Sequence, residues 1–142
     1  MTDQIVVADA DALIALTLEK DHNHEKAILV ASLFVKRNLE IVFPATVFPE
    51  AITSLVRAVD QPQKARLISQ QLQQGFFQID YPEKETLIRA GQIFEGSHSK
   101  QNTFFDAIVA ATAEKLNTKT IFSFDSWYSK LGFVSGPNLL SL

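Results

Sequence analysis

The sequence predicts an α/β domain whose largely parallel sheet is covered by helices. Short apolar runs rich in β-branched and aromatic residues alternate along the chain with longer segments that have helical spacing. Such uniformly apolar runs are typical of strands that are buried on both faces. The 142 residues contain no repeat, low-complexity tract or Pro/Gly-rich linker, so we expect one domain over residues 1–142.

Five short runs are expected to form the strands of this sheet. The run 5–9 (IVVAD) is apolar and β-branched, as a buried strand should be. The run 39–44 (LEIVFP) has the same character and ends with a proline. The other three runs are 76–80 (FFQID), 120–124 (TIFSF) and 132–136 (GFVSG).

Helices are expected between these strands. Asp11 is well placed to cap a helix over 12–20, because a short acidic side chain can accept from the free amides of the first turn. In the segment 46–59, Pro49 falls in the first turn, where a helix loses no backbone donor. The other expected helices are 24–38, 63–74, 83–94 and 103–116, with a polar loop at 95–102.

Most aromatic side chains are expected to pack inside the protein. Stacking on nucleotide bases is the alternative for aromatic residues close to a nucleic-acid site. The residues concerned are Phe76, Phe77, Phe104, Phe105, Trp127 and Tyr128.

The composition limits the kind of function. The net charge of −3, from 13 Lys and Arg against 16 Asp and Glu, argues against a broad basic surface for nucleic acid. A local acidic site is compatible with this charge, because four clustered acids would by themselves account for the negative sign of the net charge. The absence of cysteine excludes disulfides and thiolate metal sites. The longest apolar run, 27–35, is short for a membrane span and the N-terminal residues lack a basic signal-peptide region, so we expect a cytoplasmic protein.

Four acids are expected to meet at one edge of the sheet. Asp9 ends the first strand, and Asp125 directly follows the strand at 120–124. Glu50 and Asp106 lie in the first turns of helices that begin at the same edge. Ligands of open parallel sheets bind beyond the carboxyl ends of the strands, which is where these side chains would gather.

Clustered carboxylates repel one another, and a bound dication removes that conflict. A ligand set made only of oxygens suits hard ions such as Mg²⁺ or Mn²⁺ better than zinc. Such an ion can bind a phosphodiester oxygen, lower the pKa of a bound water and stabilise the leaving oxygen. The residues alone therefore lead to the hypothesis of metal-assisted hydrolysis of a phosphate ester.

The chain resembles PIN-domain ribonucleases, most closely the VapC-type toxins of bacterial toxin–antitoxin pairs. Four segments, one around each acid, carry the resemblance: VVADADALIAL, PATVFPEAITSLVR, FFDAIVAATAEKL and TIFSFDSWYSKLGF. They extend over essentially the whole chain, and their order is more specific than any single segment. The resemblance implies a PIN-like three-layer α/β/α fold around a mostly parallel five-stranded sheet.

The resemblance also implies the roles of the acids. Asp9, Glu50, Asp106 and Asp125 correspond to the catalytic acidic quartet of the family. We expect Asp9, Asp106 and Asp125 to bind Mg²⁺ or Mn²⁺, and Glu50 to bind the ion through water or to position the attacking water. The resemblance further implies RNA cleavage, a homodimer, and an antitoxin whose tail covers the site.

Ser123 and Asp11 each lie two positions from an acid of the quartet. Ser123 matches a hydroxyl residue that often precedes the last acid of the family by two positions, and is a candidate for substrate binding. Asp11 departs from the family, whose members usually carry Ser, Thr or Asn there. Asp11 is expected to cap a helix, and the alternative is an additional charge close to the metal.

Two other functions are compatible with the sequence. The pair Asp9 and Asp11 forms the D-x-D pattern of haloacid-dehalogenase-type phosphatases, but Leu13 stands where that family has Thr or Val, and its late pair of acids is missing. The second alternative is a catalytically silent PIN-like module that binds RNA or protein. Loss of a quartet member would favour such a module, and none is lost.

Overall fold

A five-stranded sheet forms the centre of the computed structural model, which describes residues 4–141. The order of strands across the sheet is β3-β2-β1-β4-β5, and all four neighbouring pairs are parallel, which confirms the predicted sheet. The strands are β1 (Ile5–Ala8), β2 (Glu40–Pro44), β3 (Gln78–Asp80), β4 (Thr120–Phe122) and β5 (Val134–Ser135).

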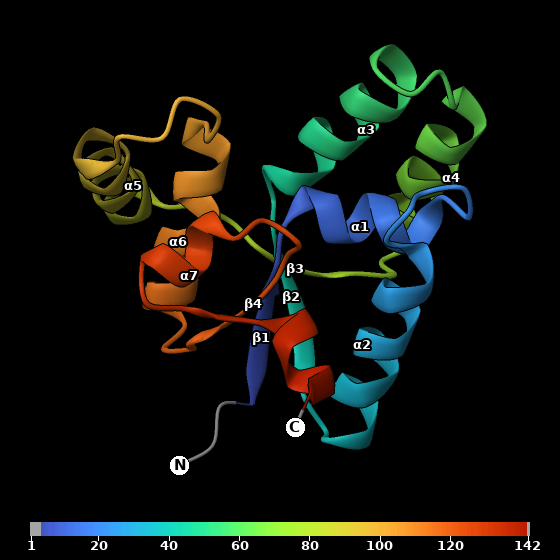
Figure 1. Cartoon of the computed structure of the whole chain (residues 1–142). Helices are drawn as coiled ribbons and strands as arrows, with labels where there is room; N and C mark the ends of the chain where they lie inside the picture. Colours follow the sequence, from blue (N-terminus) through green and yellow to red (C-terminus); the bar gives the residue numbers. More distant parts are fainter. Residues whose placement is uncertain (1–3, 142) are drawn as a thin grey trace.

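Helices cover both faces of the sheet, so the fold has three layers (Figure 1). α6 packs on β1, β2 and β4 from one side, whereas α2 packs on β2 from the other. The helices are α1 (Ala10–Thr17), α2 (His24–Lys36), α3 (Val47–Arg57), α4 (Pro62–Gln73), α5 (Lys84–Gly96), α6 (Phe104–Lys115), α7 (Trp127–Lys130) and the 3₁₀ helix η1 (Gly136–Ser141). None of the helices in the described part of the chain has the length and apolar character of a membrane span.

The buried character of the strands explains their composition. Val6, Val7 and Ala8 of β1 are all buried, as is Ile121 of β4, which lies opposite Val7. Helices on both faces leave no solvent-facing side for alternate polar residues. The apolar run that predicted β1 is therefore a consequence of its central place in the sheet.

Two short helices were not predicted. α7 is a single turn, and its residues Trp127 and Tyr128 are buried. An isolated turn of helix is unstable because its first hydrogen bond fixes several residues at once. Tertiary packing of the two aromatic rings, rather than local periodicity, stabilises α7. The 3₁₀ helix η1 follows β5 and packs against α2.

The expectation that Phe76, Phe104 and Phe105 lie in the core is wrong, since they are 69%, 39% and 42% exposed. Phe104 and Phe105 open α6 at the carboxyl edge, where the helix extends beyond the sheet. Trp127 and Tyr128 do pack inside the protein, as predicted.

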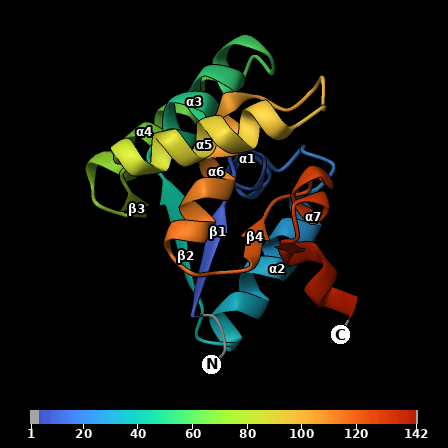
Figure 2. The same cartoon turned by 90° about the vertical axis from the view of Figure 1, so that its left-hand side faces the viewer.

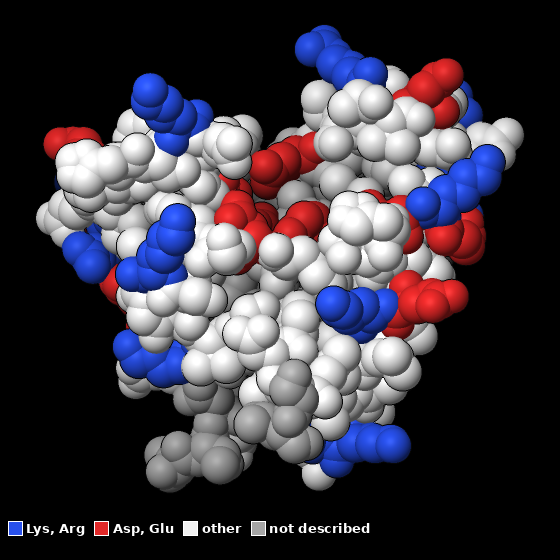
Figure 3. Space-filling model, in the orientation of Figure 1, with Lys and Arg blue, Asp and Glu red and all other residues white. Residues whose placement is uncertain are grey.

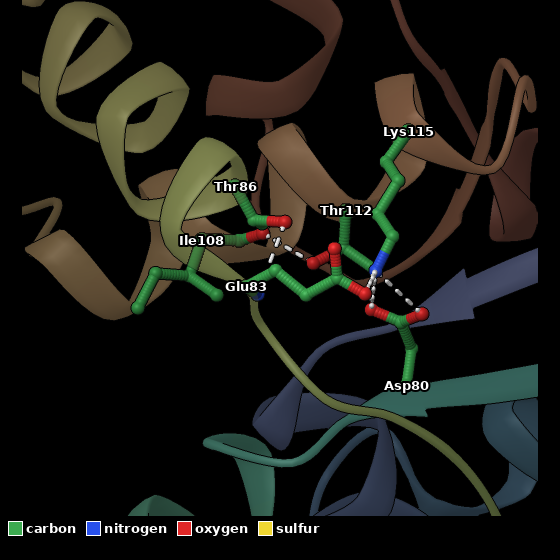
Figure 4. A network of polar contacts seen from close by, with 6 residues as sticks. All are labelled: Asp80, Glu83, Thr86, Ile108, Thr112 and Lys115. Carbon is green, nitrogen blue, oxygen red and sulfur yellow. Dashed lines mark hydrogen bonds and ion pairs between the residues drawn. The ribbon is translucent and has the colours of Figure 1, made fainter.

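The layer formed by α5 and α6 is attached to the sheet by an ionic contact. Lys115, at the end of α6, lies 3.1 and 3.2 Å from the two carboxylate oxygens of Asp80, at the end of β3 (Figure 4). It is also 3.8 Å from Glu83, which caps α5 through a reciprocal pair of hydrogen bonds with Thr86. α5 then runs across α6 and packs against it (Figure 2).

Candidate active site

Acidic side chains gather in a hollow at the carboxyl edge of the sheet. The hollow lies between the arm formed by α3 and α4 and the arm formed by α5 and α6, and Lys and Arg lie outside it on this face (Figure 3). Asp9 follows β1, Asp125 follows β4, and Glu50 and Asp106 stand in the first turns of α3 and α6. The elements therefore deliver the acids to the edge where they were expected.

Asp9 is the most buried of these acids, with 4% exposure. Its Oδ1 accepts from the Ala10 amide at 2.7 Å, and its Oδ2 accepts from the hydroxyl of Tyr128 at 2.6 Å. Burial raises the pKa of Asp9 well above its usual value, and the negative charges of Asp11, Asp106 and Glu50 raise it further. Three other carboxylates are thus close enough to act on Asp9.

Asp11 does not cap α1, and this prediction is wrong. The cap residue is Asp9, and Asp11 is the second residue of the helix, within its first turn. Its Oδ2 accepts from the Ser123 hydroxyl at 3.0 Å and from the Phe124 amide at 2.8 Å. Asp11 therefore ties α1 to the segment that follows β4. Burial raises its pKa to about 6, although both hydrogen bonds oppose the shift.

Glu50 has a pKa raised to about 7, first by burial and then by the charges of Asp106 and Asp11. Its Oε1 is buried and has no hydrogen-bond partner among the described residues, and the same is true of Oδ1 of Asp11. A buried oxygen without a hydrogen-bond donor is energetically costly. Because these two oxygens belong to acids whose pKa values are raised by neighbouring carboxylates, a cation bound between them would lower the energy of the folded protein.

Asn102 joins the remaining two acids, although it was not among the residues predicted for the site. Its side-chain amide donates to Oδ2 of Asp106 at 3.2 Å and to Oδ2 of Asp125 at 2.8 Å. The same oxygen of Asp106 accepts from the Thr103 amide at 2.9 Å. The pattern T-x-x-D over 103–106 could have indicated this cap. No local pattern could have pointed to Asn102, because its second partner lies 23 positions away.

Ser123 is buried, and its hydroxyl is engaged on both sides. It donates to Asp11 and accepts from the Asp125 amide at 3.1 Å. With 1% exposure its side chain presents no surface to a ligand. The geometry gives Ser123 a positioning role in place of the expected substrate contact.

The donor set fits a divalent cation in charge and in chemistry. The acids offer only oxygen ligands, the pKa values of Asp9, Asp11 and Glu50 are raised, and Asp11 and Glu50 carry unpaired buried oxygens. Among the described residues, no three Asp, Glu or His side chains converge closely enough to enclose an ion directly. Mg²⁺ usually keeps several waters and takes only one or two carboxylates, so direct enclosure by three is not required.

A family model for the PIN domain matches residues 6–134, so the chain belongs to the PIN-domain family. This confirms the resemblance drawn from the four acidic segments. No curated protein matches the chain.

Two solved structures share the fold. One is VapC20 of Mycobacterium tuberculosis, a toxin that cleaves the sarcin–ricin loop, with a TM-score of 0.77 and 19% identity over 91% of this chain and 96% of that one. The other is FitAcB of Neisseria gonorrhoeae, with a TM-score of 0.63 and 17% identity over 92% of this chain and 94% of that one. The PIN-like three-layer fold is thereby confirmed.

Proposed function

We propose that the chain is a divalent-metal-dependent endoribonuclease and the toxin of a bacterial toxin–antitoxin pair. The observation that carries the proposal is the convergence of Asp9, Glu50 and Asp106, three acids from different elements, at one edge of the sheet. The charges of Glu50 and Asp106 raise the pKa of Asp9, and the charge of Asp106 raises the pKa of Glu50. Membership of the PIN family and the shared fold with an RNA-cleaving toxin support it. These clustered acids fit hydrolysis of a phosphodiester best.

Each acid has a role in this proposal. Asp9, Asp106 and Asp125 would hold Mg²⁺ or Mn²⁺, in part through waters of the ion, because no three acids of the described residues enclose an ion directly. When bound, the ion would neutralise charge on the phosphodiester and make water a stronger nucleophile. Glu50 would bind the ion through water or position the attacking water. In the reaction the water oxygen bonds to phosphorus, one P–O ester bond breaks, and the leaving oxygen takes up a proton from solvent.

Partners follow from the same proposal. The substrate is RNA, and the cognate antitoxin would cover the acidic hollow with its tail. A homodimer and a cytoplasmic location complete the proposal. Co-purification with the product of an adjacent small reading frame, and the mass of the purified protein in solution, test these two associations.

The test of the proposed function is Asp9→Asn. We expect the wild-type protein to cleave RNA in Mn²⁺ and the variant to lose cleavage completely, because the amide cannot supply the charge that the ion requires. The thermal unfolding midpoint of the variant should stay at or above that of the metal-free wild type, since one source of repulsion is removed. Sequencing of cleaved RNA ends after brief expression, with Asp9→Asn as the control, identifies the target. Cleavage by the variant at the wild-type rate would refute the assignment.

A further inference from the structure

A polar pocket of about 320 Å³ adjoins Asp125 at the rim of the acidic hollow. Its walls come from the start of α2, the segment after β4, α7 and the first residues of η1. Ligand pockets have volumes of roughly 300–1,000 Å³, so this one is of a size for one small ligand unit. Because Asp125 belongs both to the pocket lining and to the acidic cluster, a ligand in this pocket lies next to one acid of the cluster.

We propose that this pocket binds one nucleotide of the RNA strand next to the scissile phosphate. The inference rests on the proposed function, and it deepens that function by assigning residues to substrate binding. In this arrangement Lys26 contacts a phosphate, Phe124 packs against a base, and hydroxyl and amide groups contact the sugar and base edges.

Lys26 is the cationic group of the pocket. It lies in the first turn of α2, its side chain is exposed, and it forms no ion pair with any residue that the structure describes. A free ammonium can therefore take up a phosphate without first breaking a salt bridge. Since the acidic hollow repels the RNA backbone, a cation beside it is needed to hold the strand.

The carboxylate of Asp125 has hydrogen-bond donors for both of its oxygens. One oxygen accepts from the Trp127 amide at 2.9 Å and the other from Asn102 at 2.8 Å. Asp125 is thus held in place, with its oxygens turned toward these donors. Lys26 approaches the pocket from a different element and offers the phosphate a separate contact.

The other walls suit a nucleotide better than a simple anion. Phe124 is half-buried and supplies an aromatic surface, which any base can pack against regardless of sequence. Ser126, Ser129 and Asn138 supply hydroxyl and amide groups from α7 and η1. Such groups can donate to and accept from a ribose 2′-hydroxyl, the feature that distinguishes RNA from DNA.

The test compares Lys26→Ala with Lys36→Ala, which removes the same charge from the opposite end of α2. Cleavage of a short labelled single-stranded RNA of mixed sequence is measured in Mn²⁺ over a series of salt concentrations. For Lys26→Ala we expect KM to rise roughly two- to fivefold at low salt, as is typical of an exposed ionic contact, with kcat unchanged. The dependence of log KM on log salt should become shallower by about 0.7, the value for one phosphate contact to a single strand.

The control and a second variant make the outcomes distinguishable. Lys36→Ala should keep the wild-type KM and salt dependence, whereas Lys26→Glu should raise KM further than Lys26→Ala. Equal KM values for Lys26→Ala and wild type would overturn the nucleotide site while leaving the nuclease intact. Equal losses for Lys26→Ala and Lys36→Ala would also overturn it, because the effect would then be one of net charge. A wild-type protein that neither binds nor cuts RNA would overturn the proposed function and this site together.

Discussion

The clustered carboxylates of the hollow depend on individual donors from distant parts of the chain. Tyr128 is fully buried, and its hydroxyl reaches Oδ2 of Asp9 across 119 positions of sequence. A residue that hydrogen-bonds a metal-binding side chain and fixes its orientation usually affects the metal affinity of the site as well as its geometry. Tyr128 is therefore a positioning residue for Asp9.

Tyr128→Phe removes this hydroxyl and nothing else. We expect the variant to fold, and its free energy of unfolding to fall by about 1 kcal/mol, since a buried carboxylate oxygen loses its donor. The affinity for Mn²⁺ should fall by about tenfold or more. Denaturant unfolding and titration calorimetry measure the two effects. Tyr81→Phe is the matched control, because Tyr81 is 68% exposed. A wild-type Mn²⁺ affinity in Tyr128→Phe would contradict the positioning role.

The segment between α5 and α6 forms part of the site, although its sequence reads as an ordinary polar loop. It is attached to the segment after β4 at two points. Ser97 accepts from the indole nitrogen of Trp127 at 3.1 Å, and Asn102 donates to Asp125 at 2.8 Å. The loop thus sets the distance between Asp106, which follows it, and Asp125.

Asn102→Ala should release Asp106 and Asp125 from their shared donor. We expect Mn²⁺ affinity and kcat both to fall by 10- to 100-fold, the usual range for a residue that orients metal ligands. Gln101→Ala is the control, since the described structure shows no hydrogen bond from the side chain of this neighbouring residue. Titration calorimetry with Mn²⁺ gives a readout separate from activity. If Asn102→Ala bound Mn²⁺ as tightly as Gln101→Ala, the bridging role would be wrong.

In the metal-free protein, repulsion among these acids lowers the stability of the folded state. The pKa of Asp11 is raised to about 6 and that of Glu50 to about 7, and that of Asp9 is also raised. As the pH rises above the usual pKa of a carboxyl group, the unfolded chain releases its protons before the folded protein does. The folded protein therefore loses stability as the pH rises, and the contributions of Asp11 and Glu50 to this loss are complete once the pH passes about 6 and about 7, respectively.

This coupling predicts how thermal stability responds to pH and metal. In a chelator, the unfolding midpoint should decrease from about pH 5 to about pH 8, and Glu50→Gln should reduce that decrease. Excess Mn²⁺ should restore stability, by about 2.7 kcal/mol at a hundredfold excess over Kd. Calorimetry of the wild type, Glu50→Gln and the exposed control Glu85→Gln makes the comparison. If Glu85→Gln reduced the decrease as much as Glu50→Gln, the buried cluster would not be its source.

Much of this architecture follows from the amino-acid sequence without reference to long-range contacts. The strands and major helices follow from local periodicity, and the edge reached by Asp9, Glu50, Asp106 and Asp125 follows from the common direction of parallel strands. Each of these inferences requires only residues close together in the chain. The exposure of Phe104 could not be obtained in this way, because burial depends on where the sheet ends.

The hydrogen bonds that orient the acids come from the folded arrangement. Asp11 looks like a helix cap when only its neighbours in sequence are considered, yet its side chain accepts a hydrogen bond from Ser123, 112 positions away. Tyr128 looks like a core aromatic residue, and its hydroxyl gains a partner only because β4 lies beside β1. The sequence is enough to bring the acids to one edge, because the alternation of strands and helices predicts parallel strands, and the carboxyl ends of parallel strands meet at one edge. How each carboxylate is held there depends on donors that chain folding brings from distant segments.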